Sequence, residues 1–368
     1  MLANFPMKLA TASAQLSSQV RQSIIASAAR SPSAENMQPW RLEWDDSALE
    51  VSYDSTRALQ SDPFGMLGMT AFGALLESID IAASGHSLST SIDAQPLHEC
   101  PLSEPKLHVE FRENFASDEL SDYLHDRCTT RRMERSKWVH EDKICLMKEA
   151  AKEYEGAKVD FIPPADLRCV AGFVAFGNRL RFENPFLYEE LTRNIRYTPS
   201  EAEKHKDGLD IRNLQLPFGV ASIMRCLRSW EMVRIANCFG YSRMVELQAY
   251  FEVMCSGGIG IISVPDNNLD SMLAGGRAFQ RVWLEATRQS IALHPVASLP
   301  VSIAYTHEGG LNFPLSAKHL AICNREKQRF LDRFPSLGNR FVQIAFRVGY
   351  GAKPLVQTLR RQTREPAS

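Results

Sequence analysis

The sequence predicts an α+β protein whose chain folds as two similar halves. Helical patterns and short strand patterns alternate along both halves, an order typical of mixed α and β folds. The chain has 368 residues, 44% of them hydrophobic, which is enough to bury a sizeable core. A short connecting helix is expected at residues 118–125, so we place the boundary between residues 1–126 and 127–368.

In the first half, the spacing of apolar residues indicates two helices and four strands. Leu16, Val20, Ile24 and Ala28 recur at i, i+4, the pattern of a half-buried helix. The helices are expected at residues 15–29 and 65–83, and the strands at 40–44, 49–53, 88–92 and 107–111. The second helix contains several glycines, and each interior glycine costs a helix about 1 kcal/mol. We therefore expect this helix to pack closely against another backbone.

The second half repeats this theme with longer helices. Helices are expected at residues 143–154, 165–181, 185–196, 268–290 and 317–334, and one long helix or two at 230–253. Strands are expected at 158–162, 257–264 and 341–346. Residues 197–217 are polar and rich in mixed charge, which predicts a loop or a lid. Residues 291–300 are expected to form a loop.

The composition excludes several classes of function. Charged residues make up 23% of the chain and its formal net charge is −1, so no broad basic surface attracts nucleic acid. No apolar run reaches the ~18 residues of a membrane span, and the N-terminus is a poor signal peptide, which predicts a cytoplasmic protein. The eight cysteines and nine histidines lack metal-ligand spacing, so we expect reduced thiols and no metal.

The most informative run lies at residues 31–41 and reads Ser-Pro-Ser-Ala-Glu-Asn-Met-Gln-Pro-Trp-Arg. Pro32 and Pro39 stiffen both ends of the run and keep it out of regular structure. Its short polar side chains and backbone N–H groups suit a phosphate or a polar ring edge. The alternative is an ordinary turn that ends a helix, because Ser, Pro and Asn dominate turns.

The order Pro-Ser-x-x-Asn-x-Gln-Pro-Trp resembles the flavin-binding loop of the nitroreductase superfamily. The resemblance implies a bound FMN and, in the usual member, a homodimer with two flavins at its interface. One subunit supplies this loop, and the other supplies an Arg-x-Ser run and a basic pair near its C-terminus. Both partners occur here further along the same chain. The sequence therefore resembles a nitroreductase dimer fused into one chain, of the Acg-like variety.

The resemblance implies a specific set of flavin-binding residues. The loop contributes Ser31, Pro32, Ser33, Asn36 and Gln38. The second half contributes the run with Arg127, Thr129 and Arg131 and the basic pair Arg360 and Arg361. Arginine suits a phosphate because its planar fork donates two parallel hydrogen bonds, although a single arginine is more often a solvated surface charge.

The segment that begins at His294–Pro295 lies where the superfamily places a loop against the N5 edge of the flavin. There the backbone N–H groups of Ala297 and Ser298 are candidate donors. An ordinary connection between helix and strand is the alternative. The glycines at 257–260 open an apolar strand, so they do not form a dinucleotide fingerprint.

The motifs supply parts for one flavin. The second half has no Pro-Ser-x-x-Asn loop, since its first helix is followed by a plain turn at residues 155–158. The first half has no Arg-x-Ser run ahead of its helix. We therefore expect one composite site per chain, and a monomer with an internal pseudo-dimer or a homodimer.

The resemblance implies an FMN-dependent oxidoreductase that transfers hydride through the flavin N5. Its small-molecule substrate would be a nitro compound, a quinone or a small heterocycle, such as a bipyrrole alcohol in antibiotic biosynthesis, and NAD(P)H is the candidate electron donor. The alternative is a protein that sequesters FMN under a closed lid without turnover. No catalytic side chain is assigned, because the superfamily has no acid or base essential to every member.

Overall fold

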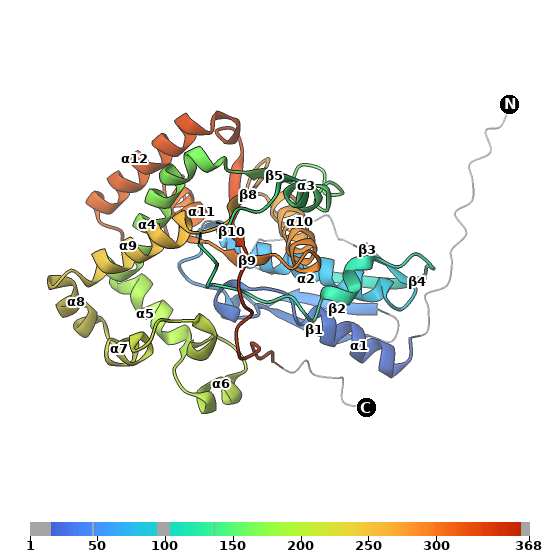
Figure 1. Cartoon of the computed structure of the whole chain (residues 1–368). Helices are drawn as coiled ribbons and strands as arrows, with labels where there is room; N and C mark the ends of the chain where they lie inside the picture. The colour runs from blue at the N-terminus through green and yellow to red at the C-terminus, as the bar shows by residue number, and fades with distance from the viewer. Residues whose placement is uncertain (1–15, 46–47, 94–103, 136, 362–368) are drawn as a thin grey trace.

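The computed structural model describes residues 16–45, 48–93, 104–135 and 137–361. It contains two four-stranded antiparallel sheets, one built from each half of the chain (Figure 1). The predicted α+β class is confirmed. The strands of the first sheet all precede residue 127 and those of the second all follow it, although the exact boundary stays a prediction.

The first sheet has the order β1-β2-β4-β3. Its strands are β1 (Trp40–Trp44), β2 (Ala48–Tyr53), β3 (Leu88–Asp93) and β4 (Lys106–Glu113). Buried and exposed residues alternate along β1, so one face of this sheet is apolar. Helices α1 (Ser18–Ala28) and α2 (Met66–Ser84) cover that face and share its core.

The second sheet has the order β5-β8-β10-β9. Its strands are β5 (Lys158–Phe161), β8 (Gly258–Val264), β9 (Ala292–Pro295) and β10 (Phe341–Gly349). Every residue of β8 and β10 is buried, because helices cover both faces. Helix α10 (Leu269–Arg288) covers one face, and α4 (Leu167–Glu183) and α11 (Ser298–Ala304) cover the other.

The two halves meet where α2 crosses α10. A Cβ atom at Gly73 would overlap the carbonyl oxygen of Leu273 and lie 3.0 Å from the Cα atom of Gly276. A Cβ atom at Gly276 would in turn lie 2.5 Å from the carbonyl oxygen of Thr70. The expected close backbone approach of this helix is thus confirmed at Gly73. The apolar core around α2 also includes residues of the second half, so the halves share one core.

The remaining helices surround the second sheet and extend to one side of it (Figure 1). They are α3 (Glu141–Glu149), α5 (Pro185–Asn194), α6 (Pro199–His205), α7 (Val220–Cys226), α8 (Trp230–Cys238), α9 (Tyr241–Met254) and α12 (Ala317–Arg333). Strands β6 (Ile195–Arg196) and β7 (Leu209–Asp210) form a small parallel pair.

Two expectations about local structure were wrong. Residues 291–300 are not a loop, because β9 pairs with β10 and α11 begins at Ser298. Residues 197–217 are not an irregular loop, because they contain α6, whose N-terminus is closed by a capping box between Thr198 and Glu201. Their role as a lid stays a prediction. The short connecting helix expected at 118–125 is confirmed as a 3₁₀ helix, Glu119–Tyr123.

One helical stretch, Pro63–Ser84, is long and apolar enough by composition to cross a membrane, which the sequence analysis did not anticipate. It coincides largely with α2, and 89% of its apolar window is buried inside the protein. The apolarity of this helix is therefore explained by its place in the core between the two sheets.

Candidate functional site

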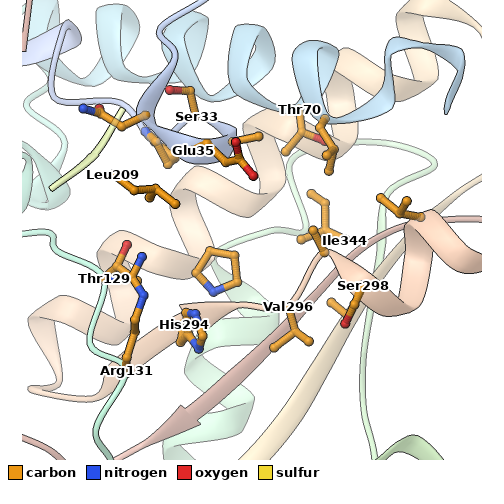
Figure 2. Close-up of a pocket in the computed structure, with 18 of the residues that line it drawn as sticks. Ser33, Glu35, Thr70, Thr129, Arg131, Leu209, His294, Val296, Ser298 and Ile344 are labelled. Carbon is orange, nitrogen blue, oxygen red and sulfur yellow. The ribbon is translucent and has the colours of Figure 1, made fainter. Parts of the chain in front are cut away.

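A cavity of about 380 Å³ lies between the two halves. Its walls come from the 31–38 loop and α2 of the first half, and from α4, α9, α10, β9, α11 and β10 of the second. Residues 208–214 and the C-terminal tail complete it, and Figure 2 shows how side chains from these elements converge. The volume falls within the range of small-molecule and cofactor sites.

The predicted loop reaches the cavity through a strained backbone. Glu35, Asn36 and Gln38 all have left-handed conformations, with φ values of 50°, 58° and 52°. Such values are uncommon outside glycine and persist only where surrounding bonds hold them. Here the N–H of Gln38 donates to Ser33 Oγ at 2.9 Å, and the Gln38 amide donates to the carbonyl of Asn36 at 3.1 Å.

The loop residues divide into two groups. Pro32, Ser33 and Asn36 line the cavity. Ser31 does not, because its fully buried hydroxyl bonds to Ala28 O at 2.7 Å and to Ser78 Oγ at 2.8 Å. Gln38 is also buried outside the cavity lining. Both residues therefore hold the loop in place rather than face a ligand.

Three arginines gather at one part of the cavity wall: Arg30, Arg127 and Arg360. Arg127 donates to the carbonyl of Arg30 at 2.6 Å and stacks on Trp283 at 4.4 Å. Arg360 donates to the carbonyls of Ala29 at 2.9 Å and Arg30 at 3.1 Å. Within the described residues none of the three forms an ion pair with a carboxylate. The Nε–H groups of Arg30 and Arg127 are buried there without a hydrogen-bond partner.

The electrostatics of this cluster favour an anion. Burial, followed by the charge of Arg30, lowers the pKa of Arg127 to about 9. Burial and the charges of Arg127 and Arg30 hold the pKa of Arg360 well below its ordinary value. Three guanidinium groups that lack carboxylate partners and repel one another are stabilised when a phosphate or similar anion binds between them.

Thr129 and Arg131, which the sequence analysis also named, line the cavity as well. Thr129 forms a bridge with Leu293, so the Arg127 run lies alongside β9. The Arg131 side chain donates to the carbonyl of Asn213 at 2.9 Å, and its backbone N–H donates to Gln215 Oε1 at 2.6 Å. The run is thus tied to the segment predicted to be a lid.

Ala297 and Ser298 line the cavity at the start of α11. The Ser298 hydroxyl accepts a bond from Asn178 at 3.1 Å and donates to the carbonyl of Val174 at 3.3 Å. Arg361 is not brought to the cavity. Its guanidinium donates to the carbonyls of Gln38 at 2.8 Å and Trp40 at 2.9 Å, and so it joins the tail to β1.

The structure adds cavity residues that sequence reasoning missed. Glu35 forms an ion pair with Arg181 and accepts a bond from Asn194 at 2.8 Å. Arg30 and Arg347 also line the cavity. Arg30 follows directly on α1 and precedes the loop, so its position beside the motif was the one available signal. Glu35 lies inside the motif, at one of its unspecified positions. Arg347 lies on β10, far along the chain, where no local pattern marks it.

A strap of residues 206–215 crosses one side of the cavity and is bonded to both halves. Asn36 donates to the carbonyl of Gly208 at 3.2 Å, and Gln38 donates to that of Lys206 at 2.9 Å. Asp207 pairs with Arg57 and Arg196. Gln215 donates to the carbonyl of Ala352 in the tail at 3.0 Å.

No protein-family model matches the chain. The uncharacterized protein MT1398 of Mycobacterium tuberculosis (strain CDC 1551 / Oshkosh) is 25% identical over 281 residues. The match covers 75% of this chain and 38% of the relative, so the chain spans well under half of the length of that relative.

The solved structures to which the chain is similar include nitroreductases. A putative nitroreductase in complex with FMN from Desulfovibrio desulfuricans is 10% identical, with a TM-score of 0.34, over 67% of this chain and 94% of that one. A nitroreductase with bound FMN from Bacteroides fragilis NCTC 9343 is 13% identical, with a TM-score of 0.32, over 68% and 97%.

The FMN-dependent nitroreductase NfnB from Mycobacterium smegmatis, described in complex with NADPH, is 13% identical, with a TM-score of 0.30, over 63% of this chain and 88% of that one. Scores this low place no residue of the site. The function below is therefore inferred from the site itself.

Proposed function

We propose that the protein is an FMN-dependent oxidoreductase with one composite site per chain. The observation that carries the proposal is the cluster of Arg30, Arg127 and Arg360 beside the Pro-Ser-x-x-Asn loop, in a cavity built from both halves. The orphaned N–H groups of Arg30 and Arg127 fit a phosphate monoester, and the cavity has the size of a cofactor site. Bound FMN would supply two-electron redox chemistry.

The chain itself would bind, orient and shield the cofactor. The three arginines would hold the phosphate. Asn36 would orient the rest of the molecule through its buried Oδ1, which lacks a partner among the residues described. Apolar side chains such as Val296 and Ile344 would exclude water from the cavity (Figure 2).

The charges of the cavity bear on the substrate class. Arg131 adds to the three clustered arginines, whereas the acidic residues of the lining, Glu35, Asp210 and Glu252, are each paired with an arginine. The interior therefore favours an electron-poor or anionic compound over a cation. We propose a nitro compound, a quinone or a small oxygen-bearing heterocycle as substrate, with NAD(P)H as the donor to be tested.

One observation favours a second candidate function, the sequestration of FMN without turnover. The 206–215 strap is bonded to the loop through Asn36 and Gln38 and to the tail through Gln215. A strap fixed at both ends slows exchange of a second substrate with solvent, as a storage protein requires.

The phosphate site is tested by Arg127→Ala. Hydrogen bonds to charged groups contribute roughly 1.5–3 kcal/mol, so the FMN dissociation constant should rise about tenfold to a hundredfold at ~1.4 kcal/mol per decade. Riboflavin lacks the phosphate, and its affinity should change far less. Arg132→Ala, at an exposed position of the same run, is the matched control. An equal loss for FMN and riboflavin would show that Arg127 is structural.

The two candidate functions are separated by stopped-flow reduction of the FMN-loaded chain with NADH and NADPH. Rapid reduction by either nucleotide is expected of the oxidoreductase. No reduction by either nucleotide leaves sequestration or an oxidase that takes electrons from its own substrate, and slow release of FMN on dilution then favours sequestration. Quinone or nitro compounds added after reduction then identify the acceptor class.

A further inference from the structure

A group of polar side chains with a different character lines the cavity beside Arg131. His294 lies on β9, and Arg347 lies opposite it on β10 in the register of the sheet. Arg347 is 2% exposed and therefore cannot reach bulk water. Glu252, on α9, completes the group.

Each N–H group of the Arg347 guanidinium that makes a contact faces a hydrogen-bond acceptor. Its Nη1 donates to the carbonyl of Glu252 at 2.7 Å, and its Nη2 donates to the carbonyl of Arg131 at 3.0 Å. The Glu252 carboxylate lies 3.3 Å from Nη2. The remaining contacts are to His294 Nδ1, which lies 2.7 Å from Nη2 and 3.2 Å from Nε.

These contacts determine the protonation of the imidazole. A guanidinium has five N–H donors and no acceptor, so His294 Nδ1 must be the acceptor in both bonds. A proton on Nδ1 would point at the guanidinium N–H groups. The ring is consequently neutral and carries its proton on Nε2. Burial, together with the charges of Arg347 and Arg131, keeps the pKa of His294 well below its ordinary value, in agreement with this geometry.

The Nε2–H group has no protein partner within the described part of the chain. The ring is partly exposed and lines the cavity, where Figure 2 shows it beside Arg131. Most buried side-chain polar atoms have a hydrogen-bond partner, so an N–H group that faces the cavity without one is available to a ligand. A proton acceptor needs a free ring nitrogen, and here Nδ1 is occupied by Arg347. The remaining role for the exposed nitrogen is to donate.

We propose that His294 is a permanently neutral hydrogen-bond donor that binds a carbonyl oxygen or aromatic nitrogen of the cavity ligand through Nε2–H. Arg347 is its positioning residue, since it fixes the tautomer and the ring orientation. The identity of the ligand rests on the function proposed above, whereas the tautomer does not. Two sources offer the same acceptor chemistry: the carbonyl-bearing ring of a flavin and that of a quinone substrate.

The tautomer is tested by ¹⁵N NMR of histidine-labelled, ligand-free protein between pH 5 and pH 8. We expect Nε2 of His294 to be protonated and Nδ1 to be unprotonated throughout, with no titration. The exposed His108 provides a reference resonance, and His294→Gln assigns the signal. A proton on Nδ1, or a titration midpoint near that of an ordinary histidine, would overturn the proposal.

The donor role is tested by adding FMN, and separately menadione, to the same sample. A downfield shift of the Nε2–H proton with FMN assigns the flavin as acceptor, and a shift with menadione alone assigns the substrate. No shift with either probe overturns the donor role. If FMN fails to bind while menadione shifts the Nε2–H resonance, FMN is ruled out as the cofactor, but the role of His294 as a hydrogen-bond donor is supported.

Two variants measure the strength of the bond. His294→Gln keeps an amide donor near the position of Nε2, whereas His294→Leu removes it. We expect the affinity for the ligand identified by NMR to fall about threefold to tenfold in the leucine variant, as a neutral hydrogen bond implies, and to be retained largely in the glutamine variant. Arg347→Met should leave both ring tautomers populated in the NMR spectrum. Equal affinities of the two His294 variants would contradict the donor role.

Discussion

At the scale of single residues, the cavity is marked by guanidinium groups that the protein does not neutralise. Arg127 is 3% exposed. Its neighbours Arg30 and Arg360 are half-buried, and each donates hydrogen bonds to main-chain carbonyl groups. Carbonyl groups satisfy hydrogen bonds but offset little of the repulsion among three like charges. The folded chain without ligand therefore carries an electrostatic cost at this position, and an anion would remove it.

This cost leads to a prediction about thermal stability. In phosphate-free buffer, Arg30→Met should raise the melting temperature of the ligand-free chain, because it removes one of three repelling charges. Millimolar inorganic phosphate should raise the melting temperature of the wild type, because it binds the folded state preferentially. The free energy of unfolding would rise by up to about 2.7 kcal/mol at a hundredfold excess of phosphate over its dissociation constant. The shift with phosphate should be smaller in the variant.

Differential scanning fluorimetry with and without phosphate measures both effects. Arg132→Met is the control, since Arg132 is exposed in the run next to the cluster. Chloride at equal ionic strength separates specific binding from screening. A lower melting temperature for Arg30→Met in phosphate-free buffer would contradict the repulsion argument.

The sequence motifs predicted which residues lie near this site, but not which of their side chains point into the cavity. The motifs identified Arg127, Arg131 and Arg360 as cavity residues, but they also placed Arg361 and Gln38 there. The direction of each loop side chain depends on left-handed backbone at three non-glycine positions, which no propensity predicts. Arg347 and His294 come together only because β9 and β10 pair.

At the scale of elements, three helices of the second half are joined at one carboxylate. Glu183, the last residue of α4, accepts bonds from Arg179 of the same helix at 2.7 Å, Ser242 of α9 at 2.8 Å and His319 of α12 at 3.0 Å. Burial by itself would raise the pKa of Glu183, but the bonds from Arg179, His319 and Ser242 outweigh it and lower that pKa to about 2.

The depressed pKa of Glu183 predicts how its contribution depends on pH. Because the folded pKa is below the ordinary value of 4.5, the stabilisation is complete above about pH 4.5 and is lost as the pH falls toward 2. Glu183→Gln should therefore unfold at a lower temperature than wild type at pH 7, and the two curves should converge as the pH falls below 4.5. Glu189→Gln, at an exposed position, should show no such convergence. A constant difference from pH 7 to pH 3 would refute the role of the carboxylate charge.

The crossing of α2 and α10 gives a second prediction at this scale. Gly73→Ala forces a Cβ atom against the backbone of α10, and overpacking of this kind costs about 1–3 kcal/mol of unfolding free energy. Gly172→Ala in α4 is the matched control, because its Cβ atom meets nothing within 4 Å. The control should gain about 0.8–1.0 kcal/mol from helix propensity. Chemical denaturation of both variants measures the contrast, and equal stabilisation of the two would show that the helices can separate.

The periodicity of apolar residues predicted the long helices and strands. It did not predict the short elements whose existence depends on pairing with another strand. Helices α2, α4, α10 and α12 and strand β8 lie close to their expected bounds, because each buries a long apolar stripe or run. Strand β9 is four residues long and is defined by its partner β10. Helix α11 was not predicted, because a proline such as Pro300 usually ends a helix. Here Pro300 lies in the first turn of α11, where no backbone N–H donor is needed.

At the scale of the whole molecule, the two halves are joined through a shared core. Helices α2 and α10 meet at paired glycines, and each packs on the sheet of its own half (Figure 1). The C-terminal tail returns to the first half, where Arg360 contacts Ala29 and Arg361 contacts Trp40. The cavity draws on both halves and on this tail.

This asymmetry predicts a stoichiometry of one noncovalent FMN per chain. A second, symmetry-related site would need a Pro-Ser-x-x-Asn loop in the second half, but there the connection from α3 to β5 is the short segment 150–157. It would also need an arginine run ahead of α1 and a basic tail from the first half, and neither motif occurs in the sequence. The flavin is released with acid and quantified by absorbance against the protein concentration. The ratio per chain does not depend on the oligomeric state, so a value near one supports a single composite site. A value near two would require a second set of phosphate donors and would refute the assignment of Arg127 and Arg360 to the phosphate.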